Sequence, residues 1–147
     1  MEIMDQCSVS SLKSHAQNKP RALVVDDSNA VRQSLSFVLK IRGIQSVPTG
    51  NAAEAMNRFL AENFDLVFTD LDMPDTHGLE LIKWIRMRKP LIPVVIVSAN
   101  TTSGTRSAAA LPGVEFVQKP FSLADIDAVL APILRNFQSQ PKSRSTE

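Results

Sequence analysis

The chain of 147 residues carries 16 basic and 15 acidic side chains, a net charge of +1, so no bulk attraction to nucleic acid or anionic lipid is expected. A hydrophobic content of 44% supports a globular core and excludes global disorder. The single cysteine, Cys7, excludes an internal disulfide framework, and there is neither a signal-peptide pattern nor a run of about 18 apolar residues. These features are typical of one soluble, cytoplasmic domain.

Both ends of the chain are polar and show no sustained hydrophobic period. Residues 1–19 are rich in Ser, Lys, Gln and Asn, and residues 138–147 read QSQPKSRSTE. Such segments bury too little apolar surface to order themselves. We therefore expect a flexible leader at 1–19, one folded domain at 20–137 and a disordered tail at 138–147.

Between the tails, short apolar runs alternate with helical patterns. Strands are expected at 22–25, 44–47 (ending at Pro48), 64–70, 92–99 and 114–118. The first helix begins with Ser28 as its N-cap and ends at Arg42-Gly43. The stripe of the second helix is formed by Ala52, Ala55, Met56, Phe59 and Leu60.

A third helix follows the third strand, with Leu79, Ile82 and Ile85 as its apolar stripe and solvated charges at Lys83, Arg86, Arg88 and Lys89. A weak, alanine-rich helix is expected around 102–110. Ser122 and Asp125 open the last helix in a pattern like a capping box, and Pro132 predicts a kink or break within it. Five strands, each followed by a helical pattern, predict an α/β fold with a parallel sheet covered on both faces.

Polar residues stand where these strands end. Asp26 and Asp27 follow the first strand, Asp70 the third, Ser98 ends the fourth, and Lys119 follows the fifth. In open parallel sheets, sites form beyond the carboxyl ends of the strands, so these side chains should share one pocket. A carboxylate cluster suits Mg²⁺, which prefers oxygen ligands, whereas the absence of cysteine and histidine from these positions argues against zinc.

Such a pocket suits phosphoryl transfer. A cation and an ammonium group would neutralise charge on the transferring oxygens, while a carboxylate acts as the nucleophile. A simpler alternative is that Asp26 and Asp27 only cap the helix that follows them, since aspartate is favoured at helix N-termini.

Four segments resemble, in order, the motifs of the receiver domain of response regulators in two-component signalling. They are LVVDDS (23–28) with Arg32, DLVFTDLDMPDTHGLEL (65–81), IPVVIVSA (92–99) and FVQKPF (116–121). The resemblance covers about residues 20–137 and is strongest to stand-alone, chemotaxis-regulator-like receivers. It implies a doubly wound, flavodoxin-like sheet of order 2-1-3-4-5.

The resemblance implies roles for the acidic residues. Asp70 would be the phosphoacceptor. Mg²⁺ would be bound by Asp27 directly, by Asp26 largely through water, by Asp70, and by the backbone carbonyl of Asp72. Asp75 would lie in the loop outside this cluster.

The resemblance also implies how the phosphoryl group is sensed. Lys119 and Ser98 would contact it, and Ser98 and Phe116 would act as the switch pair. The Lys119–Pro120 peptide bond would be cis, a conformation that X–Pro bonds adopt at low cost.

As a receiver, the chain is expected to be a phosphoacceptor whose own groups are able to catalyse its phosphorylation and dephosphorylation, and otherwise not an enzyme. Its partners would be a histidine kinase or histidine phosphotransfer protein and an unknown downstream protein, with no nucleic acid and no membrane. We expect a monomer or weak dimer. About ten residues after the last helix are too few for an output domain, so we expect a stand-alone receiver that signals by protein contact or onward phosphotransfer; the alternative is one module of a larger protein.

Two other functions stay open at this point. Asp70-Leu71-Asp72 resembles the D-x-D motif of aspartyl-nucleophile phosphatases, although that motif normally follows the first strand. A pseudo-receiver, which binds partners without being phosphorylated, is the other. Sustained turnover of a generic phosphate ester would favour the phosphatase.

Overall fold

Five strands form one parallel sheet in the order β2-β1-β3-β4-β5. This computed structural model describes residues 19–73, 78–99, 108 and 110–139. The strands are β1 (Arg21–Val25), β2 (Gln45–Thr49), β3 (Leu66–Thr69), β4 (Val94–Ser98) and β5 (Val114–Gln118). The helices are α2 (Asn29–Ile41), α3 (Ala52–Ala61), α4 (Gly78–Arg88) and α6 (Leu123–Ser139). The predicted fold class and the order 2-1-3-4-5 are confirmed.

Several predictions lie wholly or largely outside the described residues. They are the leader up to residue 18, the tail from residue 140, most of the helix around 102–110, and the placement of Asp75.

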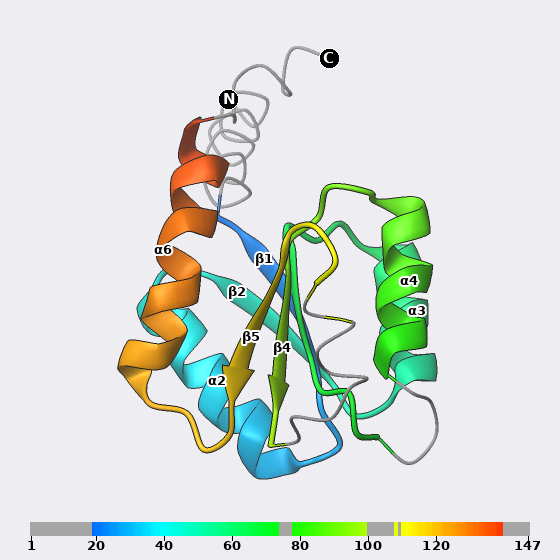
Figure 1. Cartoon of the computed structure of the whole chain (residues 1–147), viewed down its shortest axis with the longest axis horizontal. Coiled ribbons are helices and arrows are strands. Elements are labelled where there is room, and N and C mark those ends of the chain that lie inside the picture. Colours follow the sequence, from blue (N-terminus) through cyan, green and yellow to red (C-terminus); the bar gives the residue numbers. More distant parts are fainter. Residues whose placement is uncertain (1–18, 74–77, 100–107, 109, 140–147) are drawn as a thin grey trace, which may run out of the picture.

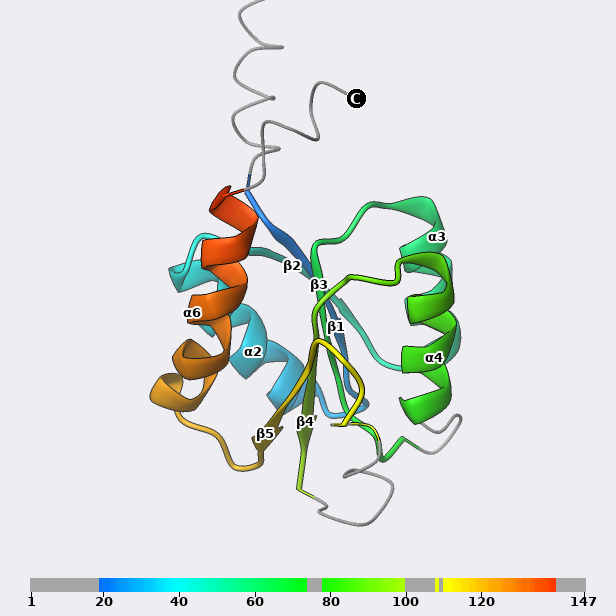
Figure 2. The same cartoon turned by 45° about the horizontal axis from the view of Figure 1, so that its top comes forward.

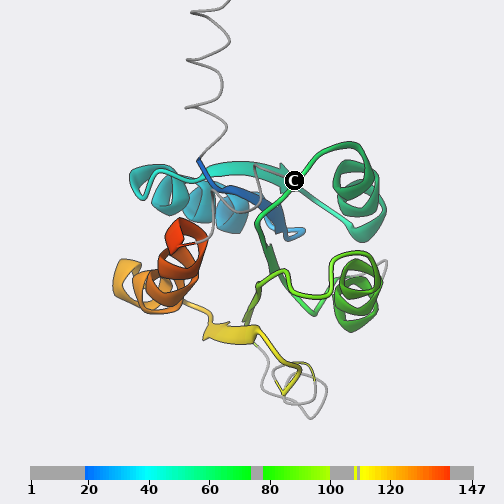
Figure 3. The same cartoon turned by 90° about the horizontal axis from the view of Figure 1, so that it is seen from above.

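Helices cover both faces of the sheet, as predicted. Figures 1, 2 and 3 show α2 and α6 on one face and α3 and α4 on the other, with the sheet between them. The core accordingly has two halves. On the α3–α4 side the large buried residues include Phe64, Leu81, Ile82, Ile85 and Ile96. On the α2–α6 side they include Leu35, Leu39, Phe68, Ile126 and Leu130.

Local sequence signals set the helix ends. The hydroxyl of Ser28 accepts a hydrogen bond from the Val31 N–H at 3.3 Å, which caps α2. Gly43 follows the end of α2 with φ of +78°, a conformation that glycine adopts without strain. At the start of α6, the Ser122 hydroxyl accepts from the Asp125 N–H and the Asp125 carboxylate accepts from the Ser122 N–H, so the predicted capping box is confirmed.

The expectation that Pro48 ends the second strand is wrong, because β2 continues to Thr49. Gln45 donates its N–H to the Pro20 carbonyl and Thr49 accepts from the Asp26 N–H, so these residues turn their backbone groups toward β1. The backbone N–H and C=O groups of successive residues in a strand point alternately to its two edges. Those of position 48 therefore point to the free edge of the sheet. Proline is tolerated there because no ladder hydrogen bond is lost.

Of the kink or break expected at Pro132, the break does not occur, and a kink stays a prediction. The helix α6 runs through this residue as one element, as Figure 1 shows. Proline removes the donor that would normally bond to the carbonyl of Ala128 one turn earlier. Both residues are exposed, so water can satisfy that carbonyl and the helix continues.

Two predictions of burial fail. Leu60, placed in the apolar stripe of α3, is 65% exposed, because the stripe that packs consists of Ala52, Ala55 and Phe59. Arg86, placed among the solvated charges, is half-buried, and its Nε donates to the Ile92 carbonyl at 2.9 Å. Burial lowers the pKa of the Arg86 guanidinium below its ordinary value.

All five strands end at the same side of the sheet, where Asp26 after β1, Asp70 after β3, Ser98 at the end of β4 and Lys119 after β5 lie together. In Figure 1 this is the edge at which the strand arrows point, and the start of β1 and the end of α6 lie at the opposite edge. No helix in the described part of the chain combines the length and apolar character that a bilayer-spanning segment needs.

Candidate phosphoryl-acceptor site

Backbone hydrogen bonds between neighbouring strands set the geometry of this edge. The Asp70 N–H donates to the Val25 carbonyl at 3.0 Å, which aligns the end of β3 with the end of β1. The Lys119 N–H donates to the Ser98 carbonyl at 3.0 Å, which aligns β5 with β4. The first residues beyond the strands are therefore held by the sheet itself.

Three predicted acidic residues converge here. Asp26, Asp27 and Asp70 each offer a carboxylate oxygen, and these oxygens lie within 4.8 Å of one another. Asp26 is 1% and Asp70 5% exposed, whereas Asp27 is exposed at the rim. Like charges so close repel each other by about 3 kcal/mol per pair at an effective dielectric constant of 20, so the cluster requires a counter-charge.

Lys119 supplies one positive charge from the far side of the pocket. Its Nζ lies 2.9 Å from Asp26 Oδ2 and donates to Asp70 Oδ2 at 3.0 Å. Burial lowers the pKa of the ammonium, but the contacts with Asp26 and Asp70 outweigh it, so the pKa of Lys119 lies above its ordinary value. Lys119 is therefore positively charged at neutral pH.

Asp26 remains only partly satisfied. Its Oδ1 accepts the Ser28 N–H at 2.9 Å, but Oδ2 is buried and receives no aligned hydrogen bond from the described residues, although the ammonium is near. Burial raises the pKa of the Asp26 carboxyl despite the opposing effect of Lys119. A buried oxygen without a hydrogen bond, next to two further carboxylates, fits an oxygen-ligated cation such as Mg²⁺.

Asp72 and Ser98 form a second group beside the acidic cluster. The Asp72 N–H donates to Asp70 Oδ1 at 3.0 Å, so both oxygens of Asp70 are held, one by this N–H and the other by Lys119. Ser98 is fully buried at the end of β4, and its hydroxyl donates to Asp72 Oδ2 at 3.3 Å. Asp72 therefore links Ser98 to the acidic cluster. From the sequence, a role was expected for the backbone carbonyl of Asp72 but none for its side chain.

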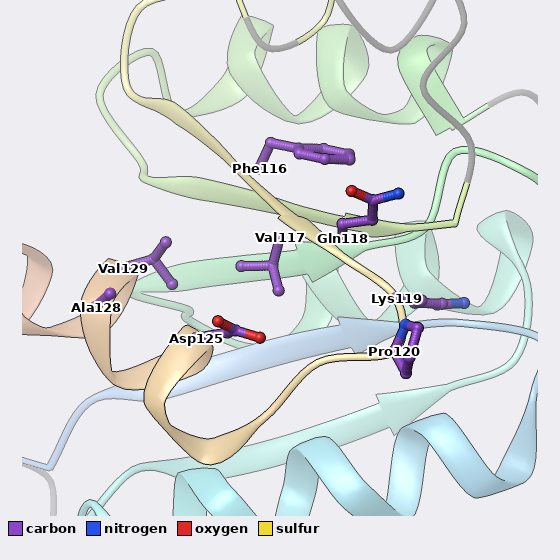
Figure 4. A pocket seen from close by; sticks show the side chains of 8 residues that line it. All are labelled: Phe116, Val117, Gln118, Lys119, Pro120, Asp125, Ala128 and Val129. Atoms are coloured by element: carbon purple, nitrogen blue, oxygen red, sulfur yellow. The ribbon is translucent and has the colours of Figure 1, made fainter.

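Phe116 lies outside this group of polar residues. Figure 4 shows Phe116 and Val117 on opposite sides of β5, with Lys119 directed toward the edge of the sheet. The Phe116 ring is half-buried and packs against the α3–α4 half of the core. The outer side of β5 and the start of α6 line a cavity of about 620 Å³, and the Lys119–Pro120 bond at its end is cis.

Arg32 fixes the loop after β1, a contact that the sequence did not indicate. Its Nη1 donates to the Asp26 carbonyl at 2.6 Å and its Nη2 to Asn29 Oδ1 at 3.3 Å. The guanidinium thus ties the first turn of α2 to the backbone that carries Asp26. One feature of the sequence could have indicated this contact: Arg32 lies four residues after the N-cap Ser28 and so falls on the same side of the helix as the cap.

Gly78 is a second residue whose role the sequence did not indicate. It begins α4 and its N–H donates to the Leu71 carbonyl at 3.1 Å. A Cβ at this position would collide with the Asp70 carbonyl oxygen and lie 2.6 Å from the Leu71 Cα. The backbone that carries Asp70 therefore packs directly on the start of α4.

Gly78→Ala is therefore expected to lower the free energy of unfolding by about 3 kcal/mol, because rigid backbone cannot move aside as a side chain does. Urea unfolding at pH 7 would measure the change. Gly50→Ala is the control, since its Cβ would meet only the tip of Arg32 at 3.3 Å. Equal stability losses in the two variants would contradict this account of the packing.

Comparisons with known proteins agree with this geometry. Residues 22–131 match the response regulator receiver domain family. The chain is 28% identical over 125 residues to the transcriptional regulator NtrC of Escherichia coli K12, covering 84% of this chain and 27% of that protein. It is 32% identical over 119 residues to the response regulator PilR of Pseudomonas aeruginosa, covering 80% of this chain and 27% of that protein. The chain thus spans about a quarter of these relatives.

Solved structures give the same result. The chemotaxis protein CheY4 of Vibrio cholerae superposes with a TM-score of 0.72 at 24% identity, over 78% of this chain and 98% of that one. The response regulator TrrA of Thermotoga maritima, in complex with Mg²⁺ and BeF, superposes with a TM-score of 0.69 at 29% identity over the same shares. With the family match spanning most of the described residues, the chain belongs to the response regulator receiver domains.

Proposed function

We propose that Asp70 is the residue that accepts a phosphoryl group. The observation that carries this proposal is the environment of its carboxylate, which lies between the acidic pair and the Lys119 ammonium, with Oδ1 held by the Asp72 N–H and Oδ2 by Nζ. Among the described aspartates, it alone directly follows β3, the middle strand of the sheet, and the acidic pair follows the neighbouring β1.

Mg²⁺ would be held by Asp26, Asp27, Asp70 and the backbone carbonyl of Asp72. When bound, the cation supplies positive charge to the oxygens of the transferring group. Asp26 and Asp27 would neutralise that cation, and the buried Oδ2 of Asp26, which receives no aligned hydrogen bond from the described residues, supports the assignment. The TrrA structure contains Mg²⁺, which supports the same choice of metal.

The donor would be a phosphohistidine of a histidine kinase or histidine phosphotransfer protein. A carboxylate oxygen of Asp70 attacks the phosphorus, a P–O bond forms, and the P–N bond breaks with its electron pair going to the imidazole nitrogen. Lys119, already 3.0 Å from Asp70, stays beside the phosphoryl oxygens and neutralises part of their charge. Asp70 then carries an acyl phosphate.

Signal output would follow from Ser98 and Phe116. In our proposal the Ser98 hydroxyl turns to a phosphoryl oxygen, and Phe116 on the adjacent strand turns inward. The pairing of these two strands along their whole length gives the change a direct path from β4 to β5. A downstream protein would read the altered surface around β5 and α6 by direct contact, without nucleic acid or membrane, from a monomer or weak dimer.

We propose no further enzymatic activity for the chain beyond catalysis of its own phosphorylation and dephosphorylation. One relative, a protein-glutamate methylesterase of Archaeoglobus fulgidus, is 37% identical over 123 residues, but the match covers 35% of that protein. Because residues 22–131 of this chain match the receiver family, we do not carry the esterase activity of that protein over to it.

The acceptor can be identified chemically. After incubation with acetyl phosphate and Mg²⁺, the full chain should carry one phosphoryl group that is labile to both acid and alkali. Reduction with borohydride converts an aspartyl phosphate to homoserine, and peptide sequencing should find homoserine at position 70. Homoserine at another position, or a stable phosphate ester, would overturn the proposal.

We also propose that residues 20–137 form the functional unit. A fragment with these bounds is expected to fold and to accept phosphate from acetyl phosphate at the rate of the full chain, within about twofold, because the groups of the pocket come from β1, β3, β4, β5 and their loops. Phosphorylation rates of the two proteins under identical conditions would test this. A tenfold loss would show that a terminal segment contributes to the pocket.

A further inference from the structure

The Asp72 side chain connects the acceptor to the switch residue. Its backbone N–H donates to Asp70 Oδ1 at 3.0 Å, and its carboxylate accepts the hydroxyl hydrogen of Ser98 at 3.3 Å. Asp72 thus contacts both the acceptor and the switch residue. Asp72 is exposed, whereas Ser98 is fully buried, so the carboxylate reaches from the surface to the end of β4.

We propose that Asp72 is a positioning residue, whose carboxylate holds the Ser98 hydroxyl in its resting orientation and competes with the phosphoryl group for it. This proposal rests on the proposed function of Asp70 and Ser98. It assigns the Asp72 side chain a role separate from that of its backbone carbonyl, which is the proposed ligand of Mg²⁺.

The competition follows from the chemistry of the groups. A serine hydroxyl has one hydrogen to donate, while a carboxylate and a phosphoryl oxygen can only accept. Ser98 therefore cannot donate to Asp72 and to a phosphoryl group on Asp70 at the same time. The resting bond of 3.3 Å is long for an O–H···O hydrogen bond, so it can be exchanged for a stronger one.

Charge acts in the same direction. Phosphorylation replaces the single negative charge of the Asp70 carboxylate with about two on the phosphoryl group, and this added negative charge lies within two residues of the Asp72 carboxylate. Repulsion then drives this exposed side chain outward into water, where it is readily solvated. Release of Ser98 is thus coupled to arrival of the phosphoryl group. Part of the free energy of the hydrogen bond between Ser98 and the phosphoryl group is spent on breaking the bond between Ser98 and Asp72.

A double-mutant cycle with beryllofluoride and Mg²⁺ tests the coupling in the full chain. Binding is measured by calorimetry for wild type, Asp72→Asn, Ser98→Ala and the double variant. Asp72→Asn retains the shape and the backbone carbonyl but weakens the acceptor, so it should tighten binding about tenfold when Ser98 is present. In the Ser98→Ala background the same substitution should change binding less than about threefold.

Amide exchange without beryllofluoride gives an independent readout. Asp72→Ala and Ser98→Ala break the same contact from opposite sides, so both should increase exchange in 94–98 and 114–118. Glu80→Gln, which removes one exposed negative charge from the first turn of α4, is the control and should resemble wild type in both measurements.

Equal tightening by Asp72→Asn in both backgrounds would show a general charge effect and overturn the proposal, as would no tightening at all. These outcomes differ from failure of the proposed function. If beryllofluoride binds wild type but not Asp70→Asn, the acceptor assignment stands whatever the cycle shows.

Discussion

Asp70→Asn is expected to reduce phosphoryl incorporation from acetyl phosphate by more than about a thousandfold, since loss of a nucleophile in well-studied enzymes costs at least that much. Asparagine fills the same space but presents an amide, which is a far weaker nucleophile than a carboxylate. Mass spectrometry of the intact protein after incubation with acetyl phosphate and Mg²⁺ would measure the incorporated group.

Asp127→Asn is the matched control for this experiment. Asp127 lies on α6 and pairs at the surface with Arg42, outside the acidic cluster. This variant should incorporate one group at the wild-type rate. Wild-type incorporation in Asp70→Asn would place the acceptor on another residue.

Asp26→Asn is expected to increase the free energy of unfolding at pH 7, on the order of 1 kcal/mol, when measured by urea unfolding without divalent metal. Burial raises the pKa of Asp26 in the folded protein, so folding favours its protonated form. That contribution is fully present below the unfolded pKa of about 3.9 and is lost as the pH rises through the folded pKa. At pH 7 wild type therefore folds with an unfavourable buried charge that asparagine removes.

The pH dependence provides the sharper test. The advantage of Asp26→Asn over wild type should shrink as the pH falls and be nearly absent below about pH 4, where Asp26 is protonated in both states. Asp27→Asn should have a smaller effect, because Asp27 is exposed and its charge is solvated. A loss of stability at pH 7 in Asp26→Asn would show that the ion pair with Lys119 outweighs the cost of burial.

The fold was predictable because the elements in the middle of the chain have clear patterns. The apolar runs at 92–99 and 114–118 contain β4 and β5, and the rule that sites form at the carboxyl ends of parallel strands brings Asp26, Asp70 and Lys119 together. Strand ends were less certain, since 64–70 became Leu66–Thr69 and 92–99 became Val94–Ser98. Residues that flank a strand continue its apolar sequence pattern, although they no longer form the hydrogen bonds of the sheet.

Other features depend on tertiary contacts that no local pattern encodes. Gly78 is needed because α4 begins against the backbone of Asp70 and Leu71, and Arg32 matters because its side chain reaches back to the loop after β1. The hydrogen bond between Ser98 and Asp72 joins residues 26 positions apart. Leu60 matched the helical period but is exposed, because the side of α3 that packs consists of Ala52, Ala55 and Phe59. The helical periodicity of apolar residues does not show how much of the apolar side of a helix is covered by neighbouring elements.

The proline in β2 has a consequence for the chain's behaviour at high concentration. An exposed strand edge with a full row of N–H donors can template pairing with another molecule, which is how edge-to-edge aggregation begins. Pro48 faces the outer edge of β2 and has no N–H, so a second chain arriving there cannot form a continuous ladder. One side of the sheet is in this way protected against intermolecular pairing by a residue that costs the native ladder nothing.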